Sequence, residues 1–152
     1  MIPEFALDAV KRFEGFHKQI TWKPVALCKP YLCPAGYWTI GYGHLCSRGT
    51  KPITKEEATD LLIIDFSKAW IGALRQCPNL SRQSIYRQMA IADFVFNLGE
   101  GRLRASTLRK RILANRWESA PAELKKWVWG GGRKLPGLIA RREVEILWWN
   151  TM

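Results

Sequence analysis

LCPAGYWTIGYGH, the sequence of residues 32–44, predicts a β-hairpin. Pro34 has a fixed φ and Gly36 tolerates a positive φ, so the segment Pro34-Ala35-Gly36 is expected to form the turn. Residues 38–42 are aromatic, β-branched or glycine, which favours a strand after that turn. The hairpin is the stretch around which the rest of the chain can be interpreted.

The two faces of the predicted strand differ sharply. Alternate residues of a strand lie on opposite faces, so one face carries Trp38, Ile40 and Tyr42. The other face carries Thr39, Gly41 and Gly43. It offers one hydroxyl group between two glycines, and a bulky ligand can approach such a backbone closely. We therefore expect this face to belong to a binding site.

A helix over residues 3–14 precedes the hairpin and places Glu14 in its last turn. Pro3 is typical of a first helical turn and Gly15 of a C-cap. The negative end of the helix dipole and the nearby phenylalanines disfavour a charged carboxylate there. A protonated carboxylic acid is what the general acid of glycoside cleavage must be. Position alone favours a solvated surface glutamate.

Together, the two segments resemble the phage-type lysozymes, the endolysins of glycoside hydrolase family 24. The family pattern is E-x8-[D or C]-x5-T, and Cys33-x5-Thr39 followed by IGYGH matches its second half. Later matches are Phe96-Asn97-Leu98-Gly99, Ser106-Thr107-Leu108, Trp127, Gly137-Leu138 and Arg141-Arg142-Glu143. The resemblance covers nearly the whole chain and implies a muramidase, an enzyme that cuts the glycan strands of bacterial peptidoglycan.

The fold that this resemblance implies is α+β, mostly α-helical and lysozyme-like. A small β-hairpin lobe is joined by a long helix to a helical lobe, with a cleft between them. Residues 1–152 form a single domain, with the first lobe over about 1–53 and the helical lobe over about 54–152. No cofactor is implied, and we expect a monomer.

The chain departs from the family pattern at two points. The spacing Glu14-x18-Cys33 is ten residues longer than usual, which predicts a rigid added loop within residues 17–30 at the mouth of the cleft. Cys33 stands where many members carry aspartate, although some relatives carry cysteine. A thiol is largely protonated near neutral pH, so it activates water less well than a carboxylate.

The resemblance also suggests roles for individual residues. Glu14 would protonate the leaving glycosidic oxygen, and Thr39, together with Cys33, would position a water on the opposite face of the sugar. For Cys33, a packing role and a covalent thioglycosyl intermediate stay open. By resemblance only, Gly43, Leu45 and Asn97 lie at the substrate cleft. From its position, Asn97 is equally a hydrogen-bonded amide at a helix end.

Three further polar side chains are expected to be structural. His44 is predicted to hold the hairpin by pairing with an acid of the following helix, Asp60 or Asp65. Arg141 and Arg142 are predicted to pair with acids such as Glu145 or to cover apolar surface.

Composition limits the class of partner. The chain has 152 residues and a formal net charge of +11, which points to an anionic partner. No nucleic-acid-binding motif is present, so cell wall and outer envelope are the better expectation. From residue 100 onward there are 12 Lys and Arg against 5 Glu. This excess of basic residues predicts a cationic and aromatic surface that contacts the anionic outer envelope. Its aromatic side chains would be those of Trp127, Trp129, Trp148 and Trp149. A solvated helical face with core tryptophans is the alternative.

The four cysteines do not indicate a metal site. Cys28, Cys33 and Cys46 lie near His44 in sequence, but they lack the paired C-x2-C spacing of zinc ligands. Cys46 and Cys77 could form a disulfide in an oxidising compartment. No metal site is predicted, and this disulfide stays open.

The N-terminal residues lack the basic and apolar regions of an export signal. The sequence is therefore expected to belong to an enzyme made in the host cytoplasm. A separate membrane-permeabilising partner would release it to the cell wall.

Beyond the hairpin the pattern is helical. Thr54 and Glu57 form a capping box, which predicts a long helix over 54–75. Ser81 is expected to open a buried central helix that Gly99 ends, and Ser106 a short helix to residue 113. A helix over 117–127 follows, then a glycine-rich basic loop over 129–134, and a last helix that Pro136 opens.

Three functions remain open from sequence. The first is the muramidase. The second is a lytic transglycosylase, which needs only one acid because the 6-hydroxyl of the substrate attacks. The third is a non-catalytic, cationic envelope-binding protein.

Overall fold

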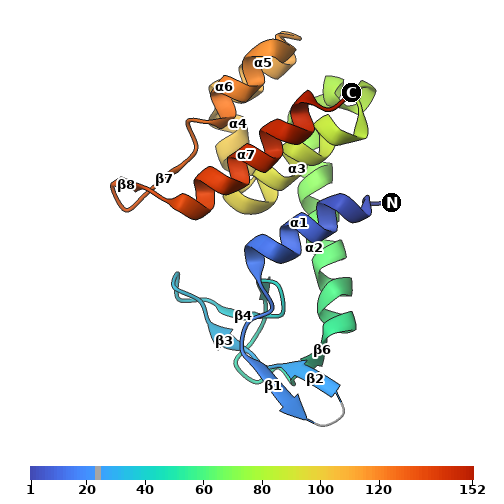
Figure 1. Cartoon of the computed structure of the whole chain (residues 1–152), viewed down its shortest axis with the longest axis vertical. Coiled ribbons are helices and arrows are strands. Elements are labelled where there is room, and N and C mark those ends of the chain that lie inside the picture. The colour runs from blue at the N-terminus through green and yellow to red at the C-terminus, as the bar shows by residue number, and fades with distance from the viewer. Residues whose placement is uncertain (23–24) are drawn as a thin grey trace. The chain divides into compact units, whose positions relative to one another are not determined.

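A computed structural model describes residues 1–22 and 25–152 (Figure 1). The chain forms two compact units, Met1–Asp65 and Phe66–Met152. The boundary falls inside helix α2 (Lys55–Gln76), the long helix that the sequence predicts. The fold is α+β and mostly helical, as expected.

The first unit begins with helix α1 (Glu4–Glu14), which confirms the predicted N-terminal helix. Ala6 and Val10 on one side of α1 are fully buried. Gly15 ends the helix with a φ of 70°, a conformation that glycine adopts without strain. Glu14 is thus the last helical residue, where the sequence places it.

Two small antiparallel sheets follow in the same unit. The first has the order β1-β2-β6 and the second β3-β4-β5. Their strands are β1 (Gln19–Trp22), β2 (Val25–Cys28), β3 (Tyr31–Leu32), β4 (Trp38–Ile40), β5 (His44–Leu45) and β6 (Ile53–Thr54). The prediction of a loop over 17–30 is therefore wrong. Its described residues contain a pair of strands, because Ile20, Leu27 and their neighbours pair across β1 and β2.

The predicted hairpin is confirmed at its turn and is wrong at its far end. The Cys33 N–H donates to the Tyr37 carbonyl at 2.9 Å, and the Gly36 N–H donates to the Cys33 carbonyl at 2.8 Å. Strand β4 stops at Ile40, and residues 41–43 form a second turn. Tyr42 and the two glycines therefore do not continue the alternation of Thr39.

Close packing explains why the strand ends there. Gly41 has a φ of 61°, and a Cβ at that position would lie 2.8 Å from the Cβ of Ala58 on α2. The chain passes so close to the helix that only glycine fits.

Helix α2 begins as the capping box predicts. The Glu57 N–H donates to the Thr54 hydroxyl at 3.1 Å, and the Thr54 N–H donates to the Glu57 carboxylate at 2.7 Å. These two bonds satisfy amide groups that the first turn of a helix leaves without partners.

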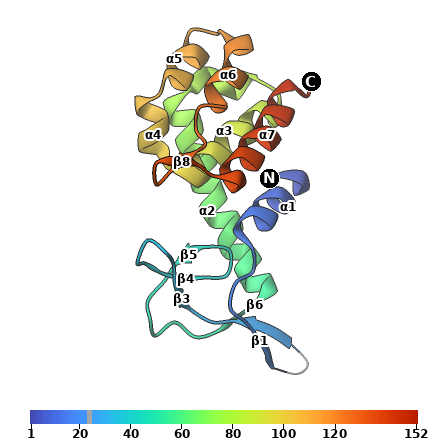
Figure 2. The same ribbon diagram turned by 60° about the vertical axis from the view of Figure 1, so that its left-hand side comes forward.

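The second unit is helical (Figure 2). Its longest elements after α2 are α3 (Ile85–Leu98) and α7 (Pro136–Asn150), which lie side by side in both views (Figures 1 and 2). Most of α3 is buried, from Met89 to Val95, as its almost uniformly apolar sequence predicts. The remaining elements are η1 (Pro78–Arg82), α4 (Glu100–Ala105), α5 (Thr107–Leu113), η2 (Trp117–Ser119), α6 (Ala120–Leu124), β7 (Trp129–Gly130) and β8 (Arg133–Lys134).

Several boundaries in this unit differ from those predicted. Ser84, not Ser81, caps α3, because a 3-10 helix occupies the preceding residues. Helix α4 was not predicted. The expected helix over 117–127 is shortened to η2 and α6, and the expected loop over 129–134 is a tight hairpin, β7-β8. The caps at Gly99 and Ser106 and the start at Pro136 are confirmed.

The predicted cationic and aromatic surface is not formed by its four tryptophans. Trp148 and Trp149 are buried, and the Trp149 indole N–H donates to the Trp117 carbonyl at 2.9 Å. The half-buried Trp127 packs edge-on against Phe94, with ring centroids 5.3 Å apart. Of the four, only Trp129 is exposed, at 59%. Three of them therefore serve packing.

Within the described ranges, none of the helices is both long enough and apolar enough to cross a bilayer.

Candidate active site

One pocket of the first unit gathers five of the six predicted site residues. Its volume is about 550 Å³. The end of α1, the β3-β4 hairpin and the segment from the second turn to β5 surround it. The predicted residues that line it are Glu14, Cys33, Thr39, Gly43 and Leu45.

Glu14 reaches this pocket from the last turn of α1 and is half-buried. Gly43 lies beside it, since a Cβ on Gly43 would be 3.6 Å from the Glu14 Oε2 atom. Gly43 also has a φ of 89°, which side chains rarely permit. The bare backbone at Gly43 therefore leaves open the space next to the carboxyl group.

Thr39 is a buried residue of β4, exposed to only 5%. Its hydroxyl donates to the carbonyl of Tyr31 at 3.3 Å, and Tyr31 is its partner in the strand register. Because the hydroxyl hydrogen is used in this bond, the oxygen can act toward a ligand or a water as an acceptor. The bond also holds the side chain in one orientation.

Cys33 lies in the turn after β3 and is half-buried. Its backbone N–H and carbonyl both close the turn, so its position is set by the hairpin. All four cysteines are free thiols in this structure. Among the described residues that line the pocket, Glu14 is the one carboxylic acid.

Sequence reasoning did not single out three residues that also line this pocket, His17, Lys18 and Tyr31. The rings of His17 and Tyr31 meet edge-on, with centroids 5.6 Å apart. Hairpin register could have identified Tyr31, because a turn over residues 34–36 places it opposite Thr39. No sequence signal marks His17 and Lys18.

The predicted anchor of the hairpin is confirmed. The Nδ1 atom of His44 lies 2.6 Å from the Asp65 Oδ2 atom. Asp65 is one of the two acids that the sequence offered, and the contact ties β5 to α2.

Asn97 belongs to the second unit. Its Oδ1 atom accepts a hydrogen bond from the Arg142 Nη2 atom at 3.0 Å, so it is the hydrogen-bonded amide at a helix end that its position predicts. A role for Asn97 at the substrate stays a prediction.

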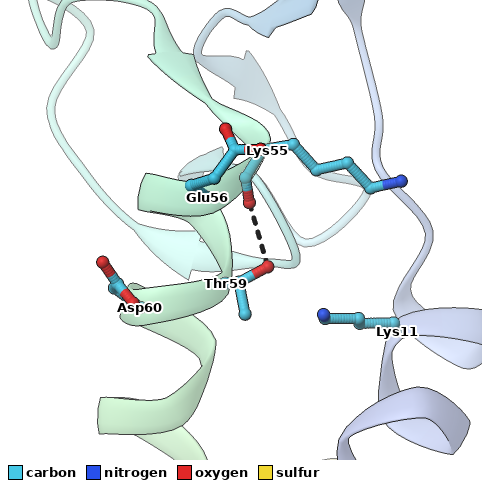
Figure 3. A pocket seen from close by; sticks show the side chains of 5 residues that line it. All are labelled: Lys11, Lys55, Glu56, Thr59 and Asp60. Carbon is cyan, nitrogen blue, oxygen red and sulfur yellow. Dashed lines mark hydrogen bonds between the residues drawn. The ribbon is translucent and has the colours of Figure 1, made fainter.

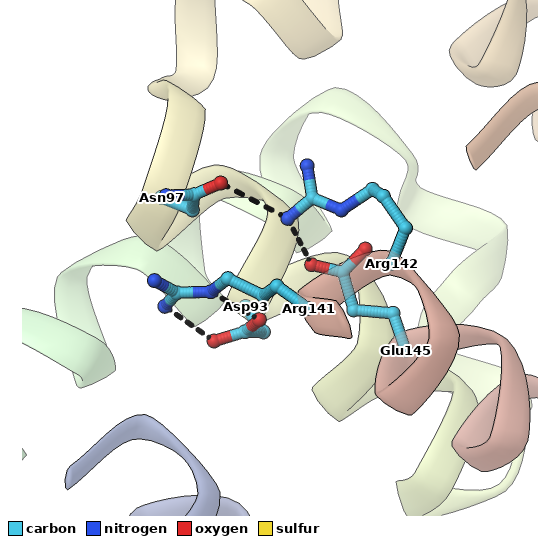
Figure 4. Close-up of polar contacts among 5 residues, drawn as sticks. All are labelled: Asp93, Asn97, Arg141, Arg142 and Glu145. Atoms are coloured by element: carbon cyan, nitrogen blue, oxygen red, sulfur yellow. Dashed lines mark hydrogen bonds and ion pairs between the residues drawn. The ribbon is translucent and has the colours of Figure 1, made fainter. Parts of the chain in front are cut away.

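Arg142 is part of a buried charged cluster between α3 and α7 (Figure 4). Arg141 donates twice to Asp93, each time at 2.8 Å, and Arg142 donates to Glu145 at 2.5 Å. The predicted pairing of the arginines with acids is thus confirmed. Burial and the neighbouring carboxylate of Asp93 raise the pKa of Glu145 well above its ordinary value.

A second pocket in the first unit, of about 390 Å³, contains none of the predicted catalytic or substrate-binding residues (Figure 3). Lys11 extends toward it from α1, and the other lining residues come from the start of α2: Lys55, Glu56, Thr59 and Asp60. The Thr59 hydroxyl donates to the Lys55 carbonyl at 2.9 Å. The two lysines and two acids that line this pocket balance one another in charge and are mostly exposed, which is typical of a solvated surface.

Comparison with known proteins gives a consistent result. The family model described as "Phage lysozyme" matches residues 11–145. An endolysin of Acyrthosiphon pisum secondary endosymbiont phage 1 is 35% identical over 149 residues, covering 95% of this chain and 94% of that protein. A SAR-endolysin of Bacteriophage PS119 is 33% identical, covering 77% and 70%. The muramidase domain of SpmX from Asticaccaulis excentricus has a similar fold, with a TM-score of 0.83 at 24% identity and coverage of 100% and 99%.

Proposed function

Since the chain belongs to the phage lysozyme family and is a lysozyme-type glycosidase, we propose that it cleaves the β-1,4 bond between N-acetylmuramic acid and N-acetylglucosamine, with Glu14 as the general acid. The family assignment itself supports degradation of bacterial peptidoglycan in cell lysis. The observation that carries the finer proposal is the pocket in which Glu14, Thr39 and Cys33 come together.

The first step is transfer of the Glu14 proton to the glycosidic oxygen. The bond between that oxygen and the sugar C1 atom breaks, and positive charge develops on the ring. A water then forms a bond to C1 from the opposite face. Its proton passes to solvent, from which Glu14 regains one.

The geometry suits Thr39 for positioning this water. Its hydroxyl hydrogen is held by the Tyr31 carbonyl, so the oxygen is free to accept a hydrogen bond from the water. The water is then oriented with its oxygen lone pair available to C1. Cys33, in the neighbouring turn, would contact the same water and help to position it.

A lytic transglycosylase is the second candidate, and one observation favours it. Glu14 is the one acid among the described residues that line the pocket, and Cys33 offers a thiol there rather than a second carboxylate. In this reaction the 6-hydroxyl of the same sugar forms the new bond to C1 and returns a proton to Glu14. No second carboxylate is needed.

Mass spectrometry of the soluble products from purified peptidoglycan would test both proposals. Glu14→Gln is the inactive variant, and Glu4→Gln is its matched control, because Glu4 is an exposed glutamate in the first turn of the same helix. Reducing muramic acid ends that require Glu14 would support the hydrolase. Anhydro-muramic ends would support the transglycosylase, and reducing glucosamine ends would show cleavage at the other linkage.

Products that survive in Glu14→Gln would contradict the role of Glu14 in either reaction. Absence of products from the unsubstituted protein would favour the third possibility, a non-catalytic cationic protein.

We also propose that the basic C-terminal region contacts the anionic outer envelope. Arg102, Arg104, Lys110 and Arg116 are exposed, and residues 101–117 include no acid. Among the described residues, these four side chains form no ion pair with an acid. Replacing these four residues by glutamine should weaken binding to lipopolysaccharide vesicles. The control replaces three basic residues of the first unit by glutamine, Arg12, Lys29 and Lys51, and should weaken binding less.

A further inference from the structure

A separate pocket of about 260 Å³ lies in the second unit, between the end of α6 and helix α7. Its apolar wall is formed by Val128, Ile139 and Ile146. Val128 is only 6% exposed, and its carbonyl accepts a hydrogen bond from the Leu135 N–H at 2.9 Å. This hydrogen bond joins the two ends of the β7-β8 hairpin just before α7 begins. It therefore holds Val128, and with it one side of the apolar wall, in a fixed position.

The rim of the pocket is charged. Lys125 and Lys134 are exposed cations, and Glu143 is an exposed acid. The ammonium group of Lys134 lies 5.6 Å from the ring centre of the exposed Trp129, which limits where that side chain can go.

Arg142 forms a further part of the pocket wall, and it differs from the two lysines in being only 1% exposed. Its Nη2 atom donates to both Asn97 and Glu145. Its Nε and Nη1 atoms are buried and have no hydrogen-bond partner among residues 1–22 and 25–152. In Figure 4 one terminal nitrogen of Arg142 points away from both Asn97 and Glu145.

Arg142 has a counter-charge in Glu145, but two of its nitrogen atoms have no hydrogen-bond partner among the described residues. Asp93 is engaged by Arg141 through two hydrogen bonds. Glu145 is the remaining counter-charge, and burial together with Asp93 raises its pKa well above the ordinary value. A buried guanidinium with unsatisfied N–H groups is costly, and an oxyanion is the group that satisfies it most directly.

We propose that this pocket binds a small aliphatic carboxylate. The carboxylate would accept hydrogen bonds from Arg142 and lie between Lys125 and Lys134. Its aliphatic part would contact Val128, Ile139 and Ile146. A monoanion fits better than a phosphate dianion, because the pocket wall is apolar and Glu143 at the rim repels the second negative charge.

Two sources could supply such a group, a free aliphatic acid and the C-terminal alanine of a peptide. Both present a carboxylate next to a small apolar group. The proposal does not depend on catalysis by Glu14, because every residue that it uses lies in the second unit.

Isothermal titration of the Glu14→Gln protein with hexanoate and with N-acetyl-D-alanyl-D-alanine would test the proposal without turnover. Lys125→Gln combined with Lys134→Gln should weaken binding about tenfold. The matched control is Lys29→Gln combined with Lys51→Gln, which removes two exposed lysines elsewhere and should leave binding unchanged.

Glu143→Gln should change affinity in the opposite direction. Removing the acid at the rim is expected to tighten binding about threefold. The control is Glu118→Gln, which removes an exposed glutamate away from the pocket and should leave the affinity unchanged. Because these are exposed side chains, the variants should fold even if Arg142 cannot be replaced.

Binding of either probe with this pattern of variants supports the proposal, and the tighter probe identifies the source. Absence of binding by both probes overturns it. Equal affinity in the rim variants and in their controls also overturns it, because the carboxylate would then lie elsewhere.

Discussion

Gly43→Ala tests whether the open space beside Glu14 is needed for cleavage. Gly43 has a φ of 89°, and an L-residue in this left-handed region costs about 1–2 kcal/mol. The new Cβ would lie 3.6 Å from the Glu14 Oε2 atom, an ordinary contact distance. The methyl group therefore adds no clash, but it occupies space that, in the proposed reaction, the glycosidic oxygen needs in order to approach Glu14.

Gly36→Ala is the matched control. Gly36 has a φ of 85°, and its added Cβ would meet none of the described atoms within 4 Å. The backbone cost is thus the same, about 1–2 kcal/mol, without an intrusion at Glu14. Urea unfolding would measure both free energies, and muropeptide release would measure kcat/KM for the folded protein.

We expect similar losses of stability and very different losses of activity. Displacing a substrate by about 1 Å costs on the order of a hundredfold in rate, so Gly43→Ala should lower kcat/KM by about that factor. Gly36→Ala should retain its activity. Equal kcat/KM values in the two variants would refute the reasoning, because the space beside Glu14 would then be irrelevant.

Further predictions concern single side chains. Asp93→Asn should lower the free energy of unfolding by about 3–5 kcal/mol, because it leaves Arg141 buried without its counter-charge. Glu100→Gln, in the more exposed pair with Arg75, should cost less than about 1 kcal/mol in the same urea experiment. Burial raises the pKa of the Cys77 thiol to about 11 from an ordinary value of 9.0. Because the thiolate is the form that reacts, iodoacetamide at pH 8 should label half-buried Cys33 long before Cys77. The unfolded chain releases the Cys77 proton first, so stability from this group should fall as pH rises from about 9 to about 11. If Cys33 helps to position the water, Cys33→Ala should lower kcat about tenfold, whereas Cys33→Asp should retain the kcat of the unsubstituted protein. Full activity in Cys33→Ala would exclude that role.

Local chemistry explains which elements could be predicted. The turn at Pro34 and Gly36 depends on the φ preferences of two residues, and the start of α2 depends on two hydrogen bonds between Thr54 and Glu57. Both features lie within a few residues of one another, so the sequence contains all the information that they need.

Predictions were wrong where a distant segment decides the outcome. Strand β4 ends at Ile40 because Gly41 passes close to Ala58, and nothing within the hairpin sequence reveals that helix. The basic composition of the C-terminal third left two possibilities for Trp148 and Trp149, an exposed envelope-binding surface and the core, and packing in the second unit buries both. Composition near a residue does not determine its burial.

The candidate site follows the same division. By itself, the sequence determined the end of α1 at Glu14 and the hairpin turn, because each follows from local conformation. Only the tertiary structure decided that Gly43 lies against Glu14, that Lys18 joins the same pocket, and that Asp93 meets Arg141 from 48 residues away. These contacts depend on how separate elements pack, and packing energies are summed over the whole unit rather than encoded in any single stretch.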